Sequence, residues 1–265
     1  MDSISSDKIL GTKKGAVGTL IFNYPEKHNA MSPEMAQAAA AVINDFNADP
    51  AVRVIILKGA GSKAFVSGGD ISQYEKNRAT PEQVAAYNQM SSGFRDALNN
   101  SAKPTIAMIR GWCLGGGLAI ALRCDMRICS EDAQFSVPAA RLSIGYGADS
   151  LGQLVDLVGP SVAKEIMFTA RRYTASEAHR IGLVNQVVQV GVLESFVQQY
   201  ADTIADNAPL AIIAAKHVIN DHVKDADKRN QAAADKAVAD CFASQDYIEG
   251  RRAFMEKRKP VWQGK

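Results

Sequence analysis

The sequence predicts an α/β fold with parallel strands, followed by a helical C-terminal region. Two observations support this prediction. Stretches of β-branched residues alternate with helical stretches up to about residue 195. From Leu193 the pattern is helical almost to the end. With 265 residues, 47% of them hydrophobic, the chain can bury a core. We therefore divide it into an α/β core, residues 1–195, and a C-terminal helical region, residues 196–265.

Individual elements have local signals. Ser32-Pro33 places a capping serine before a proline at the first helical position, which predicts a helix to about Phe46. Two capping boxes, Thr80 to Gln83 and Thr174 to Glu177, predict helices that end near Asn99 and at Gly182. Strands are expected over residues 15–24, 52–57, 104–109 and 126–130, and a short apolar helix over 117–122.

Composition excludes several classes of function. A net charge of +2 argues against a nucleic-acid partner. No signal peptide and no apolar run of about 20 residues is present, so we expect no membrane segment. The 4 cysteines form no Cys-x-x-Cys pair and the 4 histidines form no ligand pattern. We therefore expect free thiols, no metal and a cytoplasmic location.

Two glycine-bearing segments are the strongest functional signal. They are residues 64–71, Ala-Phe-Val-Ser-Gly-Gly-Asp-Ile, and residues 111–118, Gly-Trp-Cys-Leu-Gly-Gly-Gly-Leu. Each follows a predicted strand, and the second opens an apolar helix. Glycine lets a ligand approach the backbone closely, and two converging N–H groups can stabilise an oxyanion. The alternative explanation for the glycine triplet is close packing between a strand and a helix.

With their surroundings, these segments resemble the crotonase family, the enoyl-CoA hydratase/isomerase superfamily. Matching segments follow in family order from about residue 15 to 262: 25–32, 64–71, 103–107, 111–125, 133–138, 175–185 and 249–260. The resemblance implies a spiral of ββα units, a helical C-terminal trimerisation region, and a homotrimer or homohexamer. It also implies an acyl-CoA thioester as substrate, so that coenzyme A is part of the substrate and no separate cofactor is expected.

The resemblance also assigns roles to individual residues. The thioester oxygen would accept hydrogen bonds from the backbone N–H groups of Ser67 and Gly116. Near the C-terminus, Phe254 would pack near the adenine or pantetheine and Lys257 would face a phosphate, although a solvated helix face is the alternative for Lys257. The Lys27 side chain would also face a phosphate. The other coenzyme A contacts, largely through backbone, would come from the segment Lys27 to Ala30 and from Gly68, Gly69, Asp70 and Ile71.

Two alanines depart from the family pattern. Hydratases of this family use two glutamates, at the positions that Ala119 and Ala139 occupy here. Each general acid or base contributes about 10²–10⁴ in rate. Water addition by the usual route should therefore be badly impaired, and the familiar isomerase chemistry also relies on the second glutamate.

Asp149 is the best candidate to replace the glutamates, as proton carrier or nucleophile. Residues 143–150 lie where the family places groups beside the acyl chain. They resemble the Ile-Gly-x-Gly-x-Asp segment of 4-chlorobenzoyl-CoA dehalogenases, which attack through that aspartate. A helix N-cap is the alternative role for Asp149. Tyr146 is a candidate hydrogen-bond donor or packing residue, and weaker candidates are Glu75, Arg141 and Ser143.

We therefore expect an acyl-CoA-processing enzyme that stabilises a thioester enolate and resembles enoyl-CoA hydratase/isomerase. The alternatives are a CoA-thioester decarboxylase or hydrolase that uses Asp149, and a non-catalytic acyl-CoA-binding protein. Decarboxylation is attractive because an enolate-stabilising site can drive it with less acid/base help. The sequence leaves the acyl group and its length open.

Overall fold

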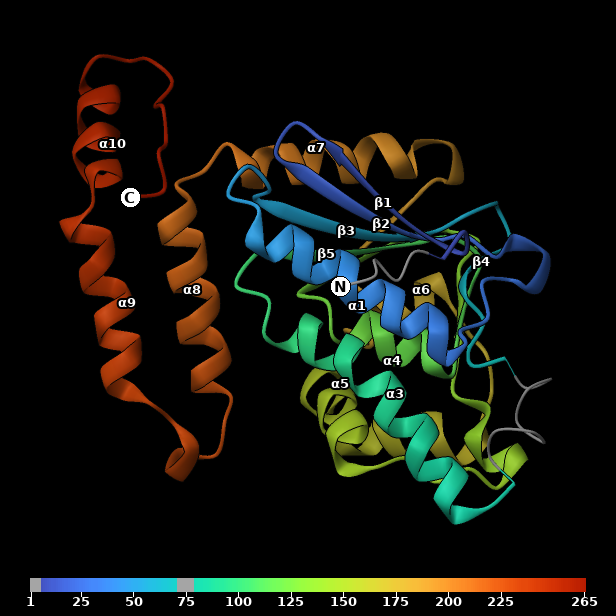
Figure 1. The fold of residues 1–265 in the computed structure, drawn as a ribbon. Coiled ribbons are helices and arrows are strands. Elements are labelled where there is room, and N and C mark those ends of the chain that lie inside the picture. The colour runs from blue at the N-terminus through green and yellow to red at the C-terminus, as the bar shows by residue number, and fades with distance from the viewer. Residues whose placement is uncertain (1–5, 71–78) are drawn as a thin grey trace.

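Two β-sheets lie at the centre of the computed structural model, which describes residues 6–70 and 79–265 (Figure 1). The larger sheet has the order β1-β2-β3-β5-β7-β10 and the smaller one β4-β6-β8-β9. The β1–β2 and β8–β9 pairs are antiparallel, and the other neighbouring pairs are parallel. The strands are β1 (Ile9–Lys14), β2 (Val17–Phe22), β3 (Val54–Gly59), β4 (Ala64–Val66), β5 (Thr105–Ile109), β6 (Trp112–Leu114), β7 (Met126–Ser130), β8 (Gln134–Ser136), β9 (Tyr173–Thr174) and β10 (Gln186–Val188).

Consecutive strands enter the two sheets alternately. β3, β5 and β7 join the larger sheet, and β4, β6 and β8, which follow them directly, join the smaller one. A helical segment comes after each such pair. The predicted spiral of ββα units is therefore confirmed, as is the predicted parallel pairing. The spiral sets β4 and β6 beside each other, so the glycines that follow the two strands come close together.

The helices begin where the capping residues predicted them. The Ser32 hydroxyl accepts from the Met35 N–H, and Thr80 and Thr174 both form complete capping boxes. No helix among the described residues is long and apolar enough to span a membrane. The helices are α1 (Pro33–Ala48), α3 (Pro81–Asn99), α4 (Gly116–Leu122), α5 (Ala148–Thr169), α6 (Ala175–Arg180), α7 (Leu193–Ala205), α8 (Pro209–His222), α9 (Gln231–Ala243) and α10 (Gln245–Met255).

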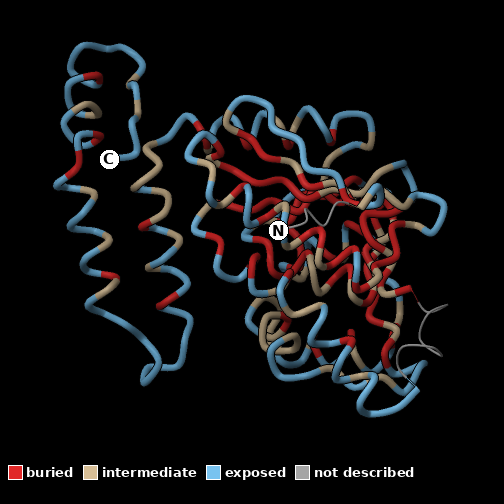
Figure 2. Tube along the Cα trace, viewed as in Figure 1, coloured by how far each residue is buried: buried red, intermediate tan, exposed pale blue. Residues whose placement is uncertain are grey.

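Buried residues concentrate in the α/β part of the molecule (Figure 2). One cluster fills the space between the larger sheet and helices such as α1, and a second lies between that sheet and α7. In α7 the buried residues recur with helical spacing: Leu193, Val197, Ala201 and Ala205. The packed core thus continues past residue 195 through Ala205, because α7 needs the sheet to cover its apolar face.

Helices α8, α9 and α10 stand beside the core and are mostly exposed (Figures 1 and 2). Specific polar contacts attach them. Lys216 of α8 donates to the Asp125 carboxylate at 2.8 Å and to the Lys103 carbonyl oxygen at 2.8 Å. Arg53 donates to the carbonyl oxygens of Ala205 and Trp262, both at 3.0 Å. The C-terminal helices are therefore held to the core by polar links and bury few residues of their own.

Candidate active site

The two glycine segments meet at one edge of the smaller sheet. β4 and β6 are parallel neighbours, with Ala64 opposite Trp112, so the chain leaves both strands in the same direction. A Cβ built on Gly68 would stand 3.4 Å from the Leu114 carbonyl oxygen and 3.8 Å from the Gly116 nitrogen. The fold thus brings two loops that are distant in sequence into contact, as a paired-donor site requires.

The three glycines of the second loop serve different purposes. Gly115 has a φ of +51°, which L side chains rarely adopt. A Cβ on Gly117 would fall 2.0 Å from the Val66 carbonyl oxygen, so α4 packs directly on β4 there. A Cβ on Gly116 would lie 3.7 Å or more from its nearest neighbours. Close packing therefore explains Gly117 and does not explain Gly116.

The Gly116 N–H opens α4 and finds no acceptor within residues 6–70 and 79–265. The Ser67 N–H, its expected partner, donates to the His28 carbonyl oxygen at 3.1 Å. A thioester oxygen that used Ser67 would share or displace this bond. Asn29 holds the same loop in place, because its side-chain amide donates to the carbonyl oxygens of Ala64 at 2.8 Å and Ala60 at 3.0 Å.

Ala119 and Ala139 lie on segments that adjoin the second loop. Ala119 is one helical turn after Gly116, on the same face of α4. Ala139 is buried, with 4% exposure, in the short 3₁₀ helix Pro138–Leu142. That segment is tied to the loop by the Gly115 N–H, which donates to the Ser136 carbonyl oxygen at 2.8 Å. Both positions offer a methyl group, which cannot transfer a proton.

Tyr146 returns to the second loop after this 3₁₀ helix. The turn is closed by the Ile144 N–H, which donates to the Ala139 carbonyl oxygen at 3.0 Å. The Tyr146 hydroxyl oxygen is 3.7 Å from the position of a Cβ on Gly115. The ring is half-buried and packs against the main core cluster. The structure therefore brings Tyr146 next to the residue that precedes Gly116.

Asp149 lies near the other end of α4. It is in the first turn of α5, whose N-cap residue is Gly147, so its side chain does not cap the helix. Its carboxylate, 63% exposed, accepts from Arg123 at 2.5 Å. The Arg123 side chain is only 2% exposed and also donates to Gln153 at 2.6 Å. Because α4 has 7 residues, it rises about 10 Å between the backbones of Gly116 and Arg123.

Sequence reasoning missed Arg123 and the bonds of Asn29. A basic residue at the end of the apolar stretch 117–122 was the available signal for Arg123. A charged side chain in such a setting needs a partner, and the partner is Asp149. The hydrogen bonds of Asn29 had no signal beyond the residue type.

The other predicted coenzyme A contacts come from the first loop and from the 25–32 segment. Ala30, Gly68 and Asp70 are buried, Gly69 is half-buried and Lys27 is exposed. Ile71 and Glu75 lie outside the described residues. Arg141 and Ser143 are exposed at the end of the 3₁₀ helix. The contacts of these residues with coenzyme A remain predictions.

Phe254 and Lys257 lie elsewhere. Phe254, 83% exposed, is on α10, and Lys257 follows that helix. In Figure 1, α10 and β4 are on opposite sides of the molecule. One chain therefore does not bring these two residues to the glycine loops, and their predicted contacts with coenzyme A would need a second copy.

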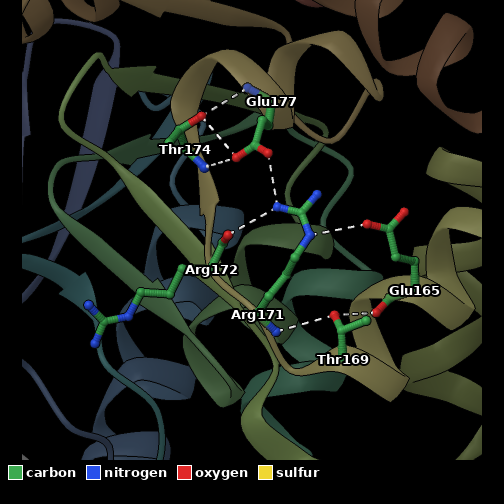
Figure 3. Close-up of polar contacts among 6 residues, drawn as sticks. All are labelled: Glu165, Thr169, Arg171, Arg172, Thr174 and Glu177. Atoms are coloured by element: carbon green, nitrogen blue, oxygen red, sulfur yellow. Dashed lines mark hydrogen bonds and ion pairs between the residues drawn. The ribbon is translucent and has the colours of Figure 1, made fainter.

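The neighbouring residues Arg171 and Arg172 make different contacts (Figure 3). Arg171 joins the end of α5 to the start of α6: it donates to Glu165 at 3.1 Å and to Glu177 at 2.9 Å. Arg172 points away from this network, and its guanidinium carbon is 5.6 Å from the centre of the Trp112 ring. Arg171 is thus a structural residue that links two helices.

Two thiols in the described part of the chain are masked by burial. Burial raises the pKa of the Cys124 and Cys129 thiols to about 12, so neither is a nucleophile at neutral pH. No group of three or more metal-ligating side chains comes together among the described residues. A groove of about 700 Å³ lies between α10 and neighbouring helices and includes Phe254, but no residue of the glycine loops lines it.

The alternating ββα units and the paired glycine loops define a protein of the crotonase fold. The structure of an enoyl-CoA hydratase/carnithine racemase from Magnetospirillum magneticum superimposes with a TM-score of 0.92 at 34% identity, over 98% of this chain and 97% of that one. The chain belongs to the enoyl-CoA hydratase/isomerase family, whose sequence model matches residues 12–265.

Named relatives agree with this assignment. A crotonyl-CoA hydratase from Syntrophomonas wolfei is 36% identical over 96% of each chain. A short-chain-enoyl-CoA hydratase from Clostridium acetobutylicum is 34% identical, also over 96% of each chain. The expected family, with its acyl-CoA chemistry, is therefore confirmed.

Proposed function

We propose that this protein is an enolate-stabilising acyl-CoA enzyme, and that decarboxylation of a malonyl-type CoA thioester is the reaction its site supports best. The supporting observation is the composition of the Gly116 end of α4. Gly116 offers a backbone donor that has no acceptor within residues 6–70 and 79–265, and the nearby segments carry alanines, Ala119 and Ala139, at the two positions where the family's hydratases have glutamates. Such a site binds an oxyanion and presents no carboxylate of its own at these two positions.

The missing carboxylates favour a substrate that carries one. Two glutamates would repel a substrate carboxylate at close range, whereas two alanines do not. Loss of CO2 leaves its electron pair on the α-carbon, and the resulting enolate oxygen is what paired N–H donors stabilise. One such donor contributes about 10²–10³ in rate. Decarboxylation therefore uses what the site has and does not need the glutamates that it lacks.

Turnover of a matched set of thioesters tests the proposal. The protein is incubated with malonyl-CoA, methylmalonyl-CoA and crotonyl-CoA, and the products are followed by mass spectrometry. We expect loss of CO2 from the first two and slow or no hydration of the third. Fast hydration of crotonyl-CoA would show that the argument from Ala119 and Ala139 is wrong.

A variant of Asp149 separates decarboxylation from the main alternative, a hydrolase or nucleophilic mechanism. Its carboxylate is held by buried Arg123, whose backbone lies about 10 Å along α4 from that of Gly116. We therefore assign the reaction to the Gly116 end of α4 and not to this paired carboxylate. On our proposal, Asp149→Asn leaves decarboxylation within about threefold of wild type, a change small beside the 10²–10⁴ of a true acid or base. A large loss of turnover would support the alternative.

A non-catalytic acyl-CoA-binding protein is the other alternative. Tight binding of every thioester in the set without any product would favour it. Phe254 and Lys257 extend the proposal to assembly, because a second copy of the chain would have to supply them to the bound coenzyme A.

A further inference from the structure

We propose that the Tyr146 hydroxyl is the proton donor to the α-carbon of the enolate. The inference rests on the proposed decarboxylation and adds the residue that completes it. Once CO2 has left, the enolate needs one proton on carbon, and neither Ala119 nor Ala139 can supply it. Either solvent or a side chain near the oxyanion donors must supply it, and only a fixed side chain would deliver it to one face of the enolate.

The position of Tyr146 meets this requirement. Its hydroxyl oxygen lies 3.7 Å from the Cβ position of Gly115, the residue directly before Gly116. An oxygen bound by the Gly116 N–H would sit about 3 Å from that nitrogen. The α-carbon is bonded to the carbonyl carbon that carries this oxygen, so it would occupy the same small region. A proton donor must come within about 3 Å of its target, and the Tyr146 hydroxyl lies beside Gly115, the residue next to Gly116.

The backbone fixes this approach. Pro138, the first residue of the 3₁₀ helix that precedes Tyr146, lies 3.9 Å from the same Gly115 Cβ position. Ser143 takes a left-handed φ of +52° at the end of the 3₁₀ helix, which turns the chain back toward the second glycine loop. The half-buried ring then packs on the core. Tyr146 is thus held by its surroundings as a positioned donor should be.

Asp149 is less well placed for the same task. Its carboxylate accepts from Arg123, whose backbone follows α4 about 10 Å of helical rise from Gly116. The phenol is therefore the better donor of the two candidates.

The reaction balances as follows. The bond between the α-carbon and the carboxylate carbon breaks, CO2 leaves, and the electron pair forms the enolate whose oxygen the N–H groups hold. The phenol O–H then gives its proton to the α-carbon, and the phenolate regains a proton from water. Substrate and one proton give CO2 and the saturated thioester, with no net oxidation or reduction.

Stereochemistry tests the role of the hydroxyl. Methylmalonyl-CoA is decarboxylated in D2O, in reactions short enough to limit spontaneous exchange of its α-hydrogen, and the configuration of the deuterated propionyl-CoA is determined. A fixed donor delivers deuterium to one face, so the wild type should give one enantiomer. Tyr146→Phe should give nearly equal amounts of both, because solvent reaches either face. Tyr200→Phe, on α7 away from the site, is the control and should match the wild type.

The outcomes separate the two proposals. No decarboxylation by the wild type overturns the proposed function and this inference with it. Turnover with one enantiomer from both wild type and Tyr146→Phe overturns the role of Tyr146 alone. Melting temperature and propionyl-CoA affinity establish that Tyr146→Phe is folded. If it is not, Tyr146→Leu replaces it with the same expectation.

Discussion

The two ends of α4 differ in the chemical groups that they present. At the Gly116 end the chain offers a backbone donor, two methyl groups and a phenol. At the other end a buried guanidinium, Arg123, holds a carboxylate, Asp149. One end stabilises charge that develops during a reaction and the other carries charge that is already paired. The 7 residues of α4 separate the backbone of Gly116 from that of Arg123.

The largest effect is expected from Gly117→Ala at the first end. Its Cβ would overlap the Val66 carbonyl oxygen at 2.0 Å, and backbone atoms cannot yield as a flexible side chain does. We expect a loss of about 3 kcal/mol or more in the free energy of unfolding. Chemical denaturation measures it. Gly152→Ala is the matched control, because a Cβ there meets nothing within 4 Å and should stabilise its helix slightly.

Gly116→Pro tests the donor without disturbing the fold. Proline is accepted at the first position of a helix but has no N–H. We expect turnover to fall by about 10²–10³, with the melting temperature close to that of the wild type. The measurement is steady-state decarboxylation together with thermal unfolding. Unchanged turnover in a folded variant would remove Gly116 from the oxyanion site.

Asp149→Asn probes the second end. Arg123 would keep a hydrogen-bond acceptor but lose its counter-charge while remaining buried. We expect a loss of about 1–2 kcal/mol, less than for a fully buried pair because Asp149 is largely exposed. Urea unfolding measures it, and Asp156→Asn, an exposed residue of the same helix, is the control. Equal stability of the two variants would show that the ion pair contributes nothing.

The smallest effect concerns the pH dependence of stability at the junction between α5 and α6, which lies past the Arg123 end of α4. The Thr174 N–H and then Arg171 hold the pKa of Glu177 at about 2, below its usual 4.5. A lowered carboxyl pKa stabilises the fold above the unfolded value, and this contribution is lost as pH falls from about 4.5 toward 2. Glu177→Gln retains the capping geometry without the charge. Its stability deficit should be present at pH 6 and shrink toward pH 3, and a deficit independent of pH would contradict the assignment.

Local signals predicted much of the fold. Capping serine and threonine side chains placed the starts of α1, α3 and α6, because a cap is a contact within four residues. β1 and the strands of the smaller sheet were not predicted. Strands of two or three residues, such as β9, are too short to show a period, and their identity depends on the partner strand.

The sequence by itself determined the family, the paired glycine loops and the absence of acids at Ala119 and Ala139, because motif order and residue type are properties of the chain. Only the tertiary structure decided that Gly117 serves packing whereas Gly116 does not, that Tyr146 reaches Gly115, and that Asp149 is paired with Arg123. These facts depend on distances between segments remote in sequence. Such distances are set by the pairing of β4 with β6 and by the packing of α5 beside α4, which no local pattern encodes.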